Sequence, residues 1–575
     1  METFTKCEQH DVNSYSKKAA IKGGWKSAIF IIVVEFGERF AYYGVSGNLI
    51  TYLTVVLKQP LATAAKNVNL WHGVSAIFPI LGAFLADSFF GRFKTIVFSS
   101  LTYLLGLVML VISVESIPLE HRLLAFFVAL YVINIGEGGH RPCIQTFAAD
   151  QFDDRLPEEK AAKSSFFNWW YLGIVLGATT SILVVIYVQD NVGWGWGFAI
   201  PAIVVALALG VFLFRKNTYR CQDPVGSPFT KVAQVMVAAF RKRRLLPENG
   251  WGMCVKAEDT VIHPLAHTNQ FRYYVFMCVC VFIILVLIIL PAINTMDRFL
   301  DKAAIIDETD VSSGKSNQWR LCTVNQVEQV KLLLRLVPIW LSCLMFAVII
   351  AQLSTFYTKQ ASTLVRTIGS TNFQLPPASL QVLPGLTILT VVPLYERILI
   401  PTARRLTGHP SGITMLQRIG FGILFSILTM TVSAIVETKR VRVATEHGLL
   451  DNPKVVVPMR VWWLVPQYVL MGVSDVFAIV GLQELFYDQV PEEMRSMGAA
   501  AYLSVLGVGS FMSSALISVI QGITGDKWLK GDNLNRAHLD YFYWVLACLS
   551  GLSLVFYVVL AKGYVYKEVQ RDGEV

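Results

Sequence analysis

The most chemically distinctive residues of the chain form a short charged cluster inside an apolar stretch. Glu35, Glu38 and Arg39 follow one another within a run of isoleucine, valine and phenylalanine. Spacings of three and four residues place all three side chains on one face of a helix. One guanidinium cannot neutralise both carboxylates, so one acid is left able to take up and release a proton. An ion cluster that only holds helices together is the alternative, and the excess of acid favours proton handling.

Two further charges also lie in apolar runs. Arg141 directly precedes Pro142, whose missing backbone N–H frees a carbonyl group, and Asp475 lies in a separate apolar stretch. A buried arginine needs an anionic partner, which can be a solute or an acid on another helix. His140, beside Arg141, is more typical of a packed histidine than of a titrating one. If Arg141 and Asp475 meet, they form a buried bridge that protonation or an anion breaks, which is how a gate behaves.

The remainder of the chain is poor in charge, and this decides where such residues can lie. The 575 residues are 54% hydrophobic and 15% charged, with a mean hydropathy of +0.52. Soluble proteins carry about 25% charged residues. The composition indicates a polytopic helical membrane protein and excludes a soluble enzyme with one anchor, a disordered chain and a disulfide-stapled secreted chain. A charge at the bilayer centre costs roughly 2.5 to 3.5 kcal/mol, so the charged residues must face a wet path or a partner.

The elements that position these residues are apolar windows of about 20 residues, the length of a membrane span. Twelve windows are expected, at about 27–50, 70–90, 95–114, 123–146, 165–188, 195–214, 332–356, 376–399, 414–436, 460–486, 498–521 and 540–562. A hydrophilic stretch separates the first six windows from the last six. This layout is typical of two repeat-related six-helix bundles around a central cavity.

The predicted organisation has five parts. They are a cytosolic tail (1–26), an N-terminal bundle (27–216), a cytosolic linker (217–330), a C-terminal bundle (331–563) and a second cytosolic tail (564–575). Basic residues near the even-numbered connections place both termini in the cytosol; they are Arg92, Lys94, Arg215, Lys216, Arg404 and Arg405. A second basic group contradicts this orientation; it comprises Lys439, Arg440, Arg442, Lys454 and Arg460.

No cofactor, metal or nucleic acid is expected. The nine cysteines form no CxxC pair, and the chain contains neither HExxH nor GxSxG, so the sequence does not predict an enzyme. The net charge of +9 is explained by basic loops beside anionic lipid. Residues 1–26 are polar and show no cleavable signal, so the first span is expected to act as its own signal anchor.

The charged stretches also carry a resemblance. Glu35-x-x-Glu38-Arg39-Phe followed by Tyr42-Tyr43-Gly44 is similar to the first-helix motif of the proton-coupled oligopeptide transporter family. Residues 131–153 resemble its second motif, and 165–171 and 486–491 resemble its plant branch, the nitrate and peptide transporters. Residues 82–92 are similar to the gating-loop motif of the major facilitator superfamily. The resemblance implies an all-α membrane protein with the major facilitator fold, alternating access and proton-driven uptake.

The resemblance also implies roles for individual residues. Proton coupling falls to Glu35, Glu38 and Arg39; substrate binding to Arg141, Tyr42, Tyr43, Gln352 and Asp475; and gating to Arg141, Asp475, Asp87 and Arg92. Arg141 stands where relatives usually have a lysine, and an arginine stays protonated at any physiological pH. A mechanism that needs this group to become neutral is therefore excluded.

The expected function is proton-coupled symport of a small anionic or zwitterionic solute, nitrate or a short peptide first. Ser46 replaces the arginine that clamps peptide carboxylates in relatives, and Ile350 replaces a nitrate-binding histidine of one plant relative. Arg39 and Arg141 are expected to offer a small anion a positive site. The alternative is a passive uniporter or channel for nitrate in a vacuolar membrane. The expected partners are the solute, protons and lipid, with the chain a monomer or weak homodimer in the plasma or vacuolar membrane.

One segment does not fit this layout. Within the linker, the apolar residues 273–297 separate His267-Thr-Asn-Gln-Phe-Arg272 from Phe299-Leu-Asp-Lys-Ala-Ala304, which are contiguous in relatives. Because the family pattern resumes on both sides, our hypothesis is that the insert comes from a retained intron or a gene-model error and is not a native span. Sequencing of the dominant mRNA decides the matter, and a spliced transcript that still encodes the insert refutes the hypothesis.

Overall fold

The structure is a computed structural model that describes residues 23–575 with gaps at 153–156, 222–227, 244–298, 307–316, 318, 368–373, 408–412, 453–454, 491–494, 526–527, 530–532, 565 and 567–575. The apolar insert at 273–297 lies outside the described residues. So does the side chain of Asp87, although its backbone belongs to a described π-helical turn, η2 (Ala86–Phe90).

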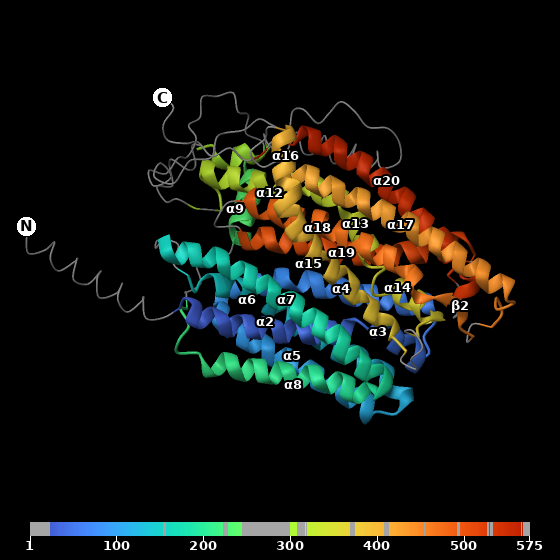
Figure 1. Cartoon of the computed structure of the whole chain (residues 1–575). Helices are drawn as coiled ribbons and strands as arrows, with labels where there is room; N and C mark the ends of the chain where they lie inside the picture. Colours follow the sequence, from blue (N-terminus) through green and yellow to red (C-terminus); the bar gives the residue numbers. More distant parts are fainter. Residues whose placement is uncertain are drawn as a thin grey trace, which may run out of the picture.

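The N-terminal half consists of long helices that run side by side (Figure 1). In the described part of the chain they are α2 (Trp25–Ser46), α4 (Leu61–Leu85), α5 (Arg92–Glu115), α6 (Leu119–Ala149), α7 (Pro157–Asn191) and α8 (Trp194–Phe214), with a short α3 (Leu49–Thr51) between the first two. Helix α2 packs on α7 and α8, while α6 packs on α4 and α5. The charged face of α2 therefore lies inside a bundle.

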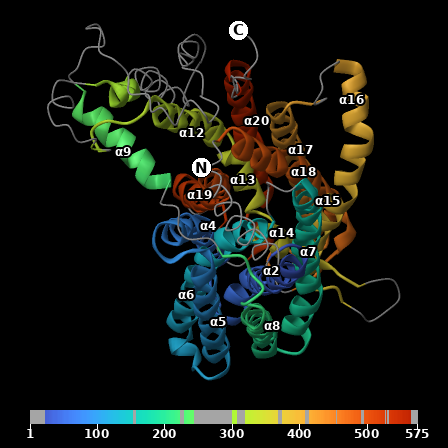
Figure 2. The same cartoon turned by 90° about the vertical axis from the view of Figure 1, so that its left-hand side faces the viewer.

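The C-terminal half repeats this arrangement with more broken helices. Its described helices are α12 (Val324–Ser342), α13 (Leu344–Ile350), α14 (Phe356–Ser362), α15 (Val382–Leu394), α16 (Ile400–Thr407), α17 (Met415–Glu446), α18 (Val465–Asp488), α19 (Arg495–Ile523) and α20 (Leu539–Gly563). Two short strands, β1 (Leu364–Val365) and β2 (Val457–Arg460), pair in parallel. A linker helix, α9 (Pro228–Arg241), lies beside α12, and the end view of Figure 2 shows it to one side of the bundles.

Ten of the described helices are long and apolar enough to cross a membrane, and the bent pair α12 and α13, which meet at 50°, gives up to eleven. Helix α2 has 22 residues, which is also a spanning length, but it carries the three charges noted above. Every one of the twelve windows predicted from the sequence contains a helix. Several helices extend beyond their windows because their ends carry polar residues; α17, for example, continues to Glu446.

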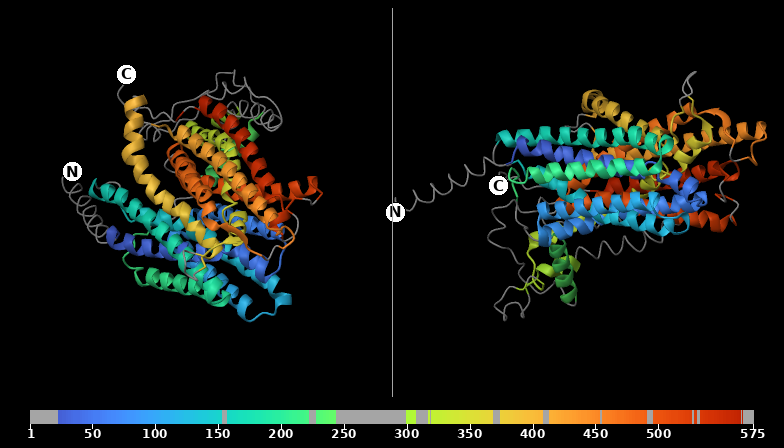
Figure 3. Two further views of the ribbon diagram at one scale, coloured as in Figure 1. Left: turned by 45° about the vertical axis from the view of Figure 1, so that its right-hand side comes forward. Right: turned by 90° about the horizontal axis from the view of Figure 1, so that it is seen from below.

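The two halves form separate groups of helices, coloured blue to green and yellow to red in Figure 3. Polar contacts between them gather at the end where α2 finishes and α4 begins. There Asn69 Nδ2 donates to Ser513 Oγ at 3.0 Å, and Gln381 Nε2 donates to the carbonyl of Gly47 at 2.9 Å. Helix α4 also packs tightly on α19, since a Cβ atom at Gly73 would overlap the ring of Phe511. We call this region the closed end.

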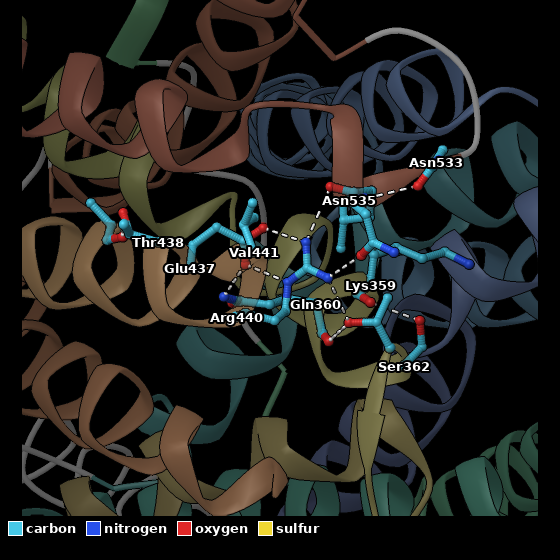
Figure 4. A network of polar contacts seen from close by, with 12 residues as sticks. Lys359, Gln360, Ser362, Glu437, Thr438, Arg440, Val441, Asn533 and Asn535 are labelled. Atoms are coloured by element: carbon cyan, nitrogen blue, oxygen red, sulfur yellow. Dashed lines mark hydrogen bonds and ion pairs between the residues drawn. The ribbon is translucent and has the colours of Figure 1, made fainter. Parts of the chain in front are cut away.

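A buried charge network stabilises the C-terminal half near the same end (Figure 4). Arg440 and Glu437 on α17 are both fully buried, with Arg440 Nη2 2.6 Å and Nε 2.8 Å from the Glu437 carboxylate. Arg440 also donates to Asn535 Oδ1 at 2.6 Å, and Gln360 Nε2 donates to Glu437 at 2.7 Å. The network therefore ties α17 to α14 and to the turn before α20.

This network explains part of the basic group that contradicted the charge rule. Arg440 is neutralised inside the protein, and the ammonium of Lys439 lies 3.2 Å from the centroid of the Trp463 ring. Arg440 is therefore not a free positive charge of a loop and carries no orientation information of the kind that the charge rule uses, whereas Lys439 is exposed and keeps its charge.

We expect Arg440→Met to lower the thermal stability of the detergent-solubilised protein strongly. Removing one partner of a buried ion pair costs about 3 to 5 kcal/mol because the other charge is left unpaired. Arg442→Met is the matched control, since this residue lies two positions further along α17 and is exposed. Equal unfolding temperatures for the two variants would contradict the structural role of the network.

Candidate functional site

The charged face of α2 is buried, and its three side chains meet as their spacing predicts. The Glu35 and Glu38 side chains are only 1% and 3% exposed. Arg39 Nε lies 2.8 Å from Glu35 Oε1 and 3.3 Å from Glu38 Oε2. The tighter contact is the pair four residues apart, in which the acid precedes the base along the helix.

Helix α6 continues this arrangement with a second arginine and a third acid. Arg141 Nε lies 3.4 Å from Glu38 Oε1, and Arg141 Nη2 lies 2.5 Å from Glu137 Oε1, one helical turn earlier. The hydroxyl of Ser75 on α4 donates to Glu137 Oε2 at 2.8 Å. Five charged side chains thus alternate in sign along one path, which we call the charge chain: Glu35, Arg39, Glu38, Arg141 and Glu137.

Close helix packing makes the contact between α4 and α6 possible. A Cβ atom at Gly82 would overlap the backbone of Gly138, so only glycine allows the two helices to approach this closely. The approach brings the hydroxyl of Ser75 to the otherwise buried carboxylate of Glu137. The glycine-rich stretch before Arg141 therefore serves close helix packing.

The charge balance of this site corrects one expectation from the sequence. Arg39 and Arg141 do not form a positive site for a small anion, because both guanidinium groups already have carboxylate partners. Three acids against two bases give the charge chain a formal charge of −1 when every acid is ionised. The sequence argument overlooked Glu137, although its spacing of four residues from Arg141 is the signal that could have found it.

The expected bridge between Arg141 and Asp475 is also not formed. Among the described residues, the carboxylates paired with Arg141 are those of Glu38 and Glu137. Asp475 Oδ1 on α18 is a buried atom with no hydrogen-bond partner. The reason is local: an acid on the same helix, one turn away, reaches the guanidinium more directly than an acid of the other half does.

Aromatic side chains surround the charge chain and extend toward Asp475. The guanidinium of Arg141 lies 4.2 Å from the centroid of the Tyr42 ring, and the Tyr42 hydroxyl is 2.8 Å from His72 Nδ1. Tyr171 on α7 is within electrostatic range of Asp475 and Tyr43. Tyr171 therefore lies near a tyrosine of its own half and an acid of the C-terminal half.

Tyr502 extends this region to α19. It is within electrostatic range of both Arg39 and Arg141 although it belongs to the other half. Sequence reasoning missed Tyr502 as a site residue. It also missed Tyr171, even though Tyr171 ends a motif that carried the family resemblance. We call Tyr43, Tyr171, Asp475 and Tyr502 the aromatic side of the site.

Gln352 lies apart from the charge chain. Its side chain is fully buried, and its Nε2 donates to the carbonyl of Val348 at 2.7 Å and to Ser513 Oγ at 3.1 Å. Ser513 in turn accepts a hydrogen bond from Asn69. The structure thus places Gln352 in the closed end, where the two halves touch.

The gating-loop motif is only partly described. Arg92, the first residue of α5, forms an ion pair with Asp150 at the end of α6. This pair joins two helices of the same half.

Comparison with known proteins decides what kind of protein carries this site. A model described as the POT family matches residues 93–533. The chain belongs to the POT family. Protein NRT1/ PTR FAMILY 5.4 of Arabidopsis thaliana is 53% identical over 559 residues, which cover 96% of this chain and 97% of the relative. Protein NRT1/ PTR FAMILY 5.10 of the same plant is 45% identical, covering 97% and 96% of the two chains.

Solved structures of the POT family confirm the fold. A structure described as an auto inhibited POT family peptide transporter superposes with a TM-score of 0.70 at 21% identity, covering 95% of this chain and 99% of that one. The POT family transporter PepTSo gives a TM-score of 0.68 at 21% identity, covering 93% and 98%. The predicted family and the all-α membrane fold of major facilitator type are thus confirmed, and this POT family member is a membrane transporter and not an enzyme.

Proposed function

We propose that this POT family member is a proton-coupled symporter that works by alternating access. The observation that carries the proposal is the unequal count of the charge chain, with three buried acids sharing two arginines. An unmatched buried carboxylate is costly when ionised, and protonation removes that cost. A proton is therefore a natural ligand of this site. Its uptake removes the charge of one acid and weakens the ion pair between that acid and its arginine.

We propose a zwitterionic solute, a short peptide first, over a simple anion. A region with paired arginines and a buried carboxylate oxygen of Asp475 that has no hydrogen-bond partner offers a counter-ion to an amino group as well as to a carboxylate. Tyr171, near Asp475, supplies an aromatic face on which an ammonium group can rest. Nitrate remains the second candidate; by charge count it requires two acids of the charge chain to be protonated before the site becomes positive.

The orientation and the membrane belong to the same proposal. With both termini in the cytosol, the closed end faces away from the cytosol, because α2 begins near the N-terminus and finishes at that end. We propose the plasma or vacuolar membrane and a monomer or weak homodimer.

Accumulation in proteoliposomes tests the proposal. An inward proton gradient is expected to drive dialanine above its equilibrium concentration, and a protonophore added at the same external pH is expected to abolish this accumulation. The reason is that a symporter can work against a solute gradient only while protons flow downhill. Uptake that is the same with and without the protonophore would favour the alternative, a passive uniporter or channel, and nitrate is the second probe in both conditions.

A further inference from the structure

Glu137 is a buried acid with two well-placed partners, and the roles that the family resemblance implies for individual residues do not include it. Its side chain is fully buried, and its two carboxylate oxygens face different groups, Arg141 Nη2 at 2.5 Å and the Ser75 hydroxyl at 2.8 Å. It is the terminal member of the charge chain. Glu38, in contrast, is shared between two arginines.

The groups around Glu137 come from five helices. Those within electrostatic range of it or of its partner Arg141 are Glu35, Glu38, Arg39, Tyr42 and Tyr43 on α2, His72 on α4, Tyr103 on α5, His140 and Arg141 itself on α6, and Tyr502 on α19. Glu38, the acid of this set that acts on Glu137 itself, disfavours a second negative charge nearby, while Arg141 favours it. The balance at Glu137 therefore depends on what else Arg141 contacts.

A solute anion that binds Arg141 must compete with Glu137. The Nη2 edge of the guanidinium is occupied by the Glu137 carboxylate at 2.5 Å, and the Nε edge faces Glu38. A carboxylate displaced from Arg141 while ionised would be a buried, unpaired charge close to Glu38, which is strongly unfavourable. The displacement becomes feasible if Glu137 takes up a proton, because the neutral acid needs only hydrogen bonds.

We propose that Glu137 is the internal counter-ion of Arg141, which holds the guanidinium when no solute is bound and releases it to the solute's carboxylate on protonation. This inference deepens the proposed function and rests on it. The hydroxyl of Ser75 is the partner of Glu137 in both forms, since it can donate to the carboxylate or accept from the neutral acid. Proton uptake and solute binding are thus linked at one helix, α6.

The pH dependence of solute exchange by the Glu137→Gln variant tests the proposal. Counterflow of dialanine is measured as a function of pH in proteoliposomes without a proton gradient. One linked proton changes the half-saturating concentration about tenfold per pH unit above the pKa of the linked group. We expect the pH dependence of the half-saturating concentration in the variant to correspond to about one linked proton fewer than in the wild type. The affinity of the variant at neutral pH is then expected to equal the wild-type affinity at acid pH.

Two further variants keep the result interpretable. Glu120→Gln, in the exposed first turn of the same helix, is the matched control and is expected to retain the wild-type slope. Ser75→Ala removes the hydroxyl but leaves the acid, so it is expected to keep the slope and shift the pH at which affinity changes. If Glu137→Gln does not fold, this shift carries the test.

The outcomes separate the inference from the function that it rests on. Wild-type protein that shows neither proton-driven accumulation nor pH-dependent exchange of dialanine or nitrate overturns the proposed function. Wild-type protein that shows both, together with an unchanged slope in Glu137→Gln, overturns only the role of Glu137. If the Glu137→Gln protein does not fold, a Ser75→Ala variant whose affinity changes at the same pH as that of the wild type also overturns the role of Glu137.

Discussion

Glu38→Gln is expected to abolish proton-driven accumulation while exchange of solute across the membrane continues. Glu38 is the member of the charge chain that two arginines share, with distances of 3.3 Å to Arg39 Nε and 3.4 Å to Arg141 Nε. Protonation of this acid therefore loosens α2 from α6, while Arg39 keeps Glu35 and Arg141 keeps Glu137 as its partner. Glutamine mimics the protonated form permanently, so the helices can still move, but their movement no longer depends on whether a proton is bound.

The size of the effect follows from the driving force. One net charge moved across 100 mV contributes about 2.3 kcal/mol, which is more than a tenfold gradient of solute. We expect the accumulation ratio of Glu38→Gln to fall to about one, the value of an uncoupled carrier. The measurement compares accumulation and counterflow in the same proteoliposomes, with the exposed Glu446→Gln at the end of α17 as the control.

Two other results would change the interpretation of Glu38. Unchanged accumulation would remove Glu38 from coupling and leave the proton to another acid of the charge chain. Loss of exchange as well as accumulation would indicate that Glu38 mainly holds α2 against α6. Both roles are conceivable for Glu38 because it is the carboxylate that joins the two helices in the charge chain. Measuring accumulation and exchange together separates the coupling role from the structural one.

The elements and the first half of the site could be predicted because they depend on local patterns. Apolar runs of spanning length locate the helices, and spacings of three and four residues place Glu35, Glu38 and Arg39 on one face. Both signals are contained within a single helix. The positions of helix ends were less accurate, because polar residues near an end do not show whether the helix stops or continues.

The partners of Arg141 could not be predicted in the same way. They depend on how α6 packs against α2 and α4, and a single sequence contains no measure of distance between helices. The expected bridge to Asp475 paired the most central base of one half with the most central acid of the other, and this ignored the closer acid at Glu137. Tyr171 and Tyr502 were missed for the same reason, since their roles depend on the juxtaposition of the halves.

The second large effect concerns Arg141. We expect Arg141→Ala to lose transport of dialanine completely and to unfold at a lower temperature than the wild type. The transport loss follows from removal of the group that receives the solute's carboxylate. The lower stability follows because Glu137 and part of Glu38 lose their partner in a buried site, which costs about 3 to 5 kcal/mol.

Arg141→Lys is expected to fall between the wild type and alanine. Retention of the positive charge alone predicts that lysine keeps much of the transport activity. The structure lowers that expectation, because Arg141 uses Nη2 for Glu137, Nε for Glu38 and its planar face for the ring of Tyr42. A lysine ammonium is a single point charge, so it cannot make all three contacts at once.

A double variant separates the two effects of the alanine substitution. Arg141→Ala combined with Glu137→Gln removes both partners of the tight pair, and removing both is far less destabilising than leaving one charge buried and alone. We expect the double variant to regain much of the lost thermal stability and to remain inactive in counterflow. Recovery of transport together with stability would show that Arg141 serves only to neutralise Glu137, and the solute's anionic group would then have to bind elsewhere, with Arg39 the remaining base of the charge chain.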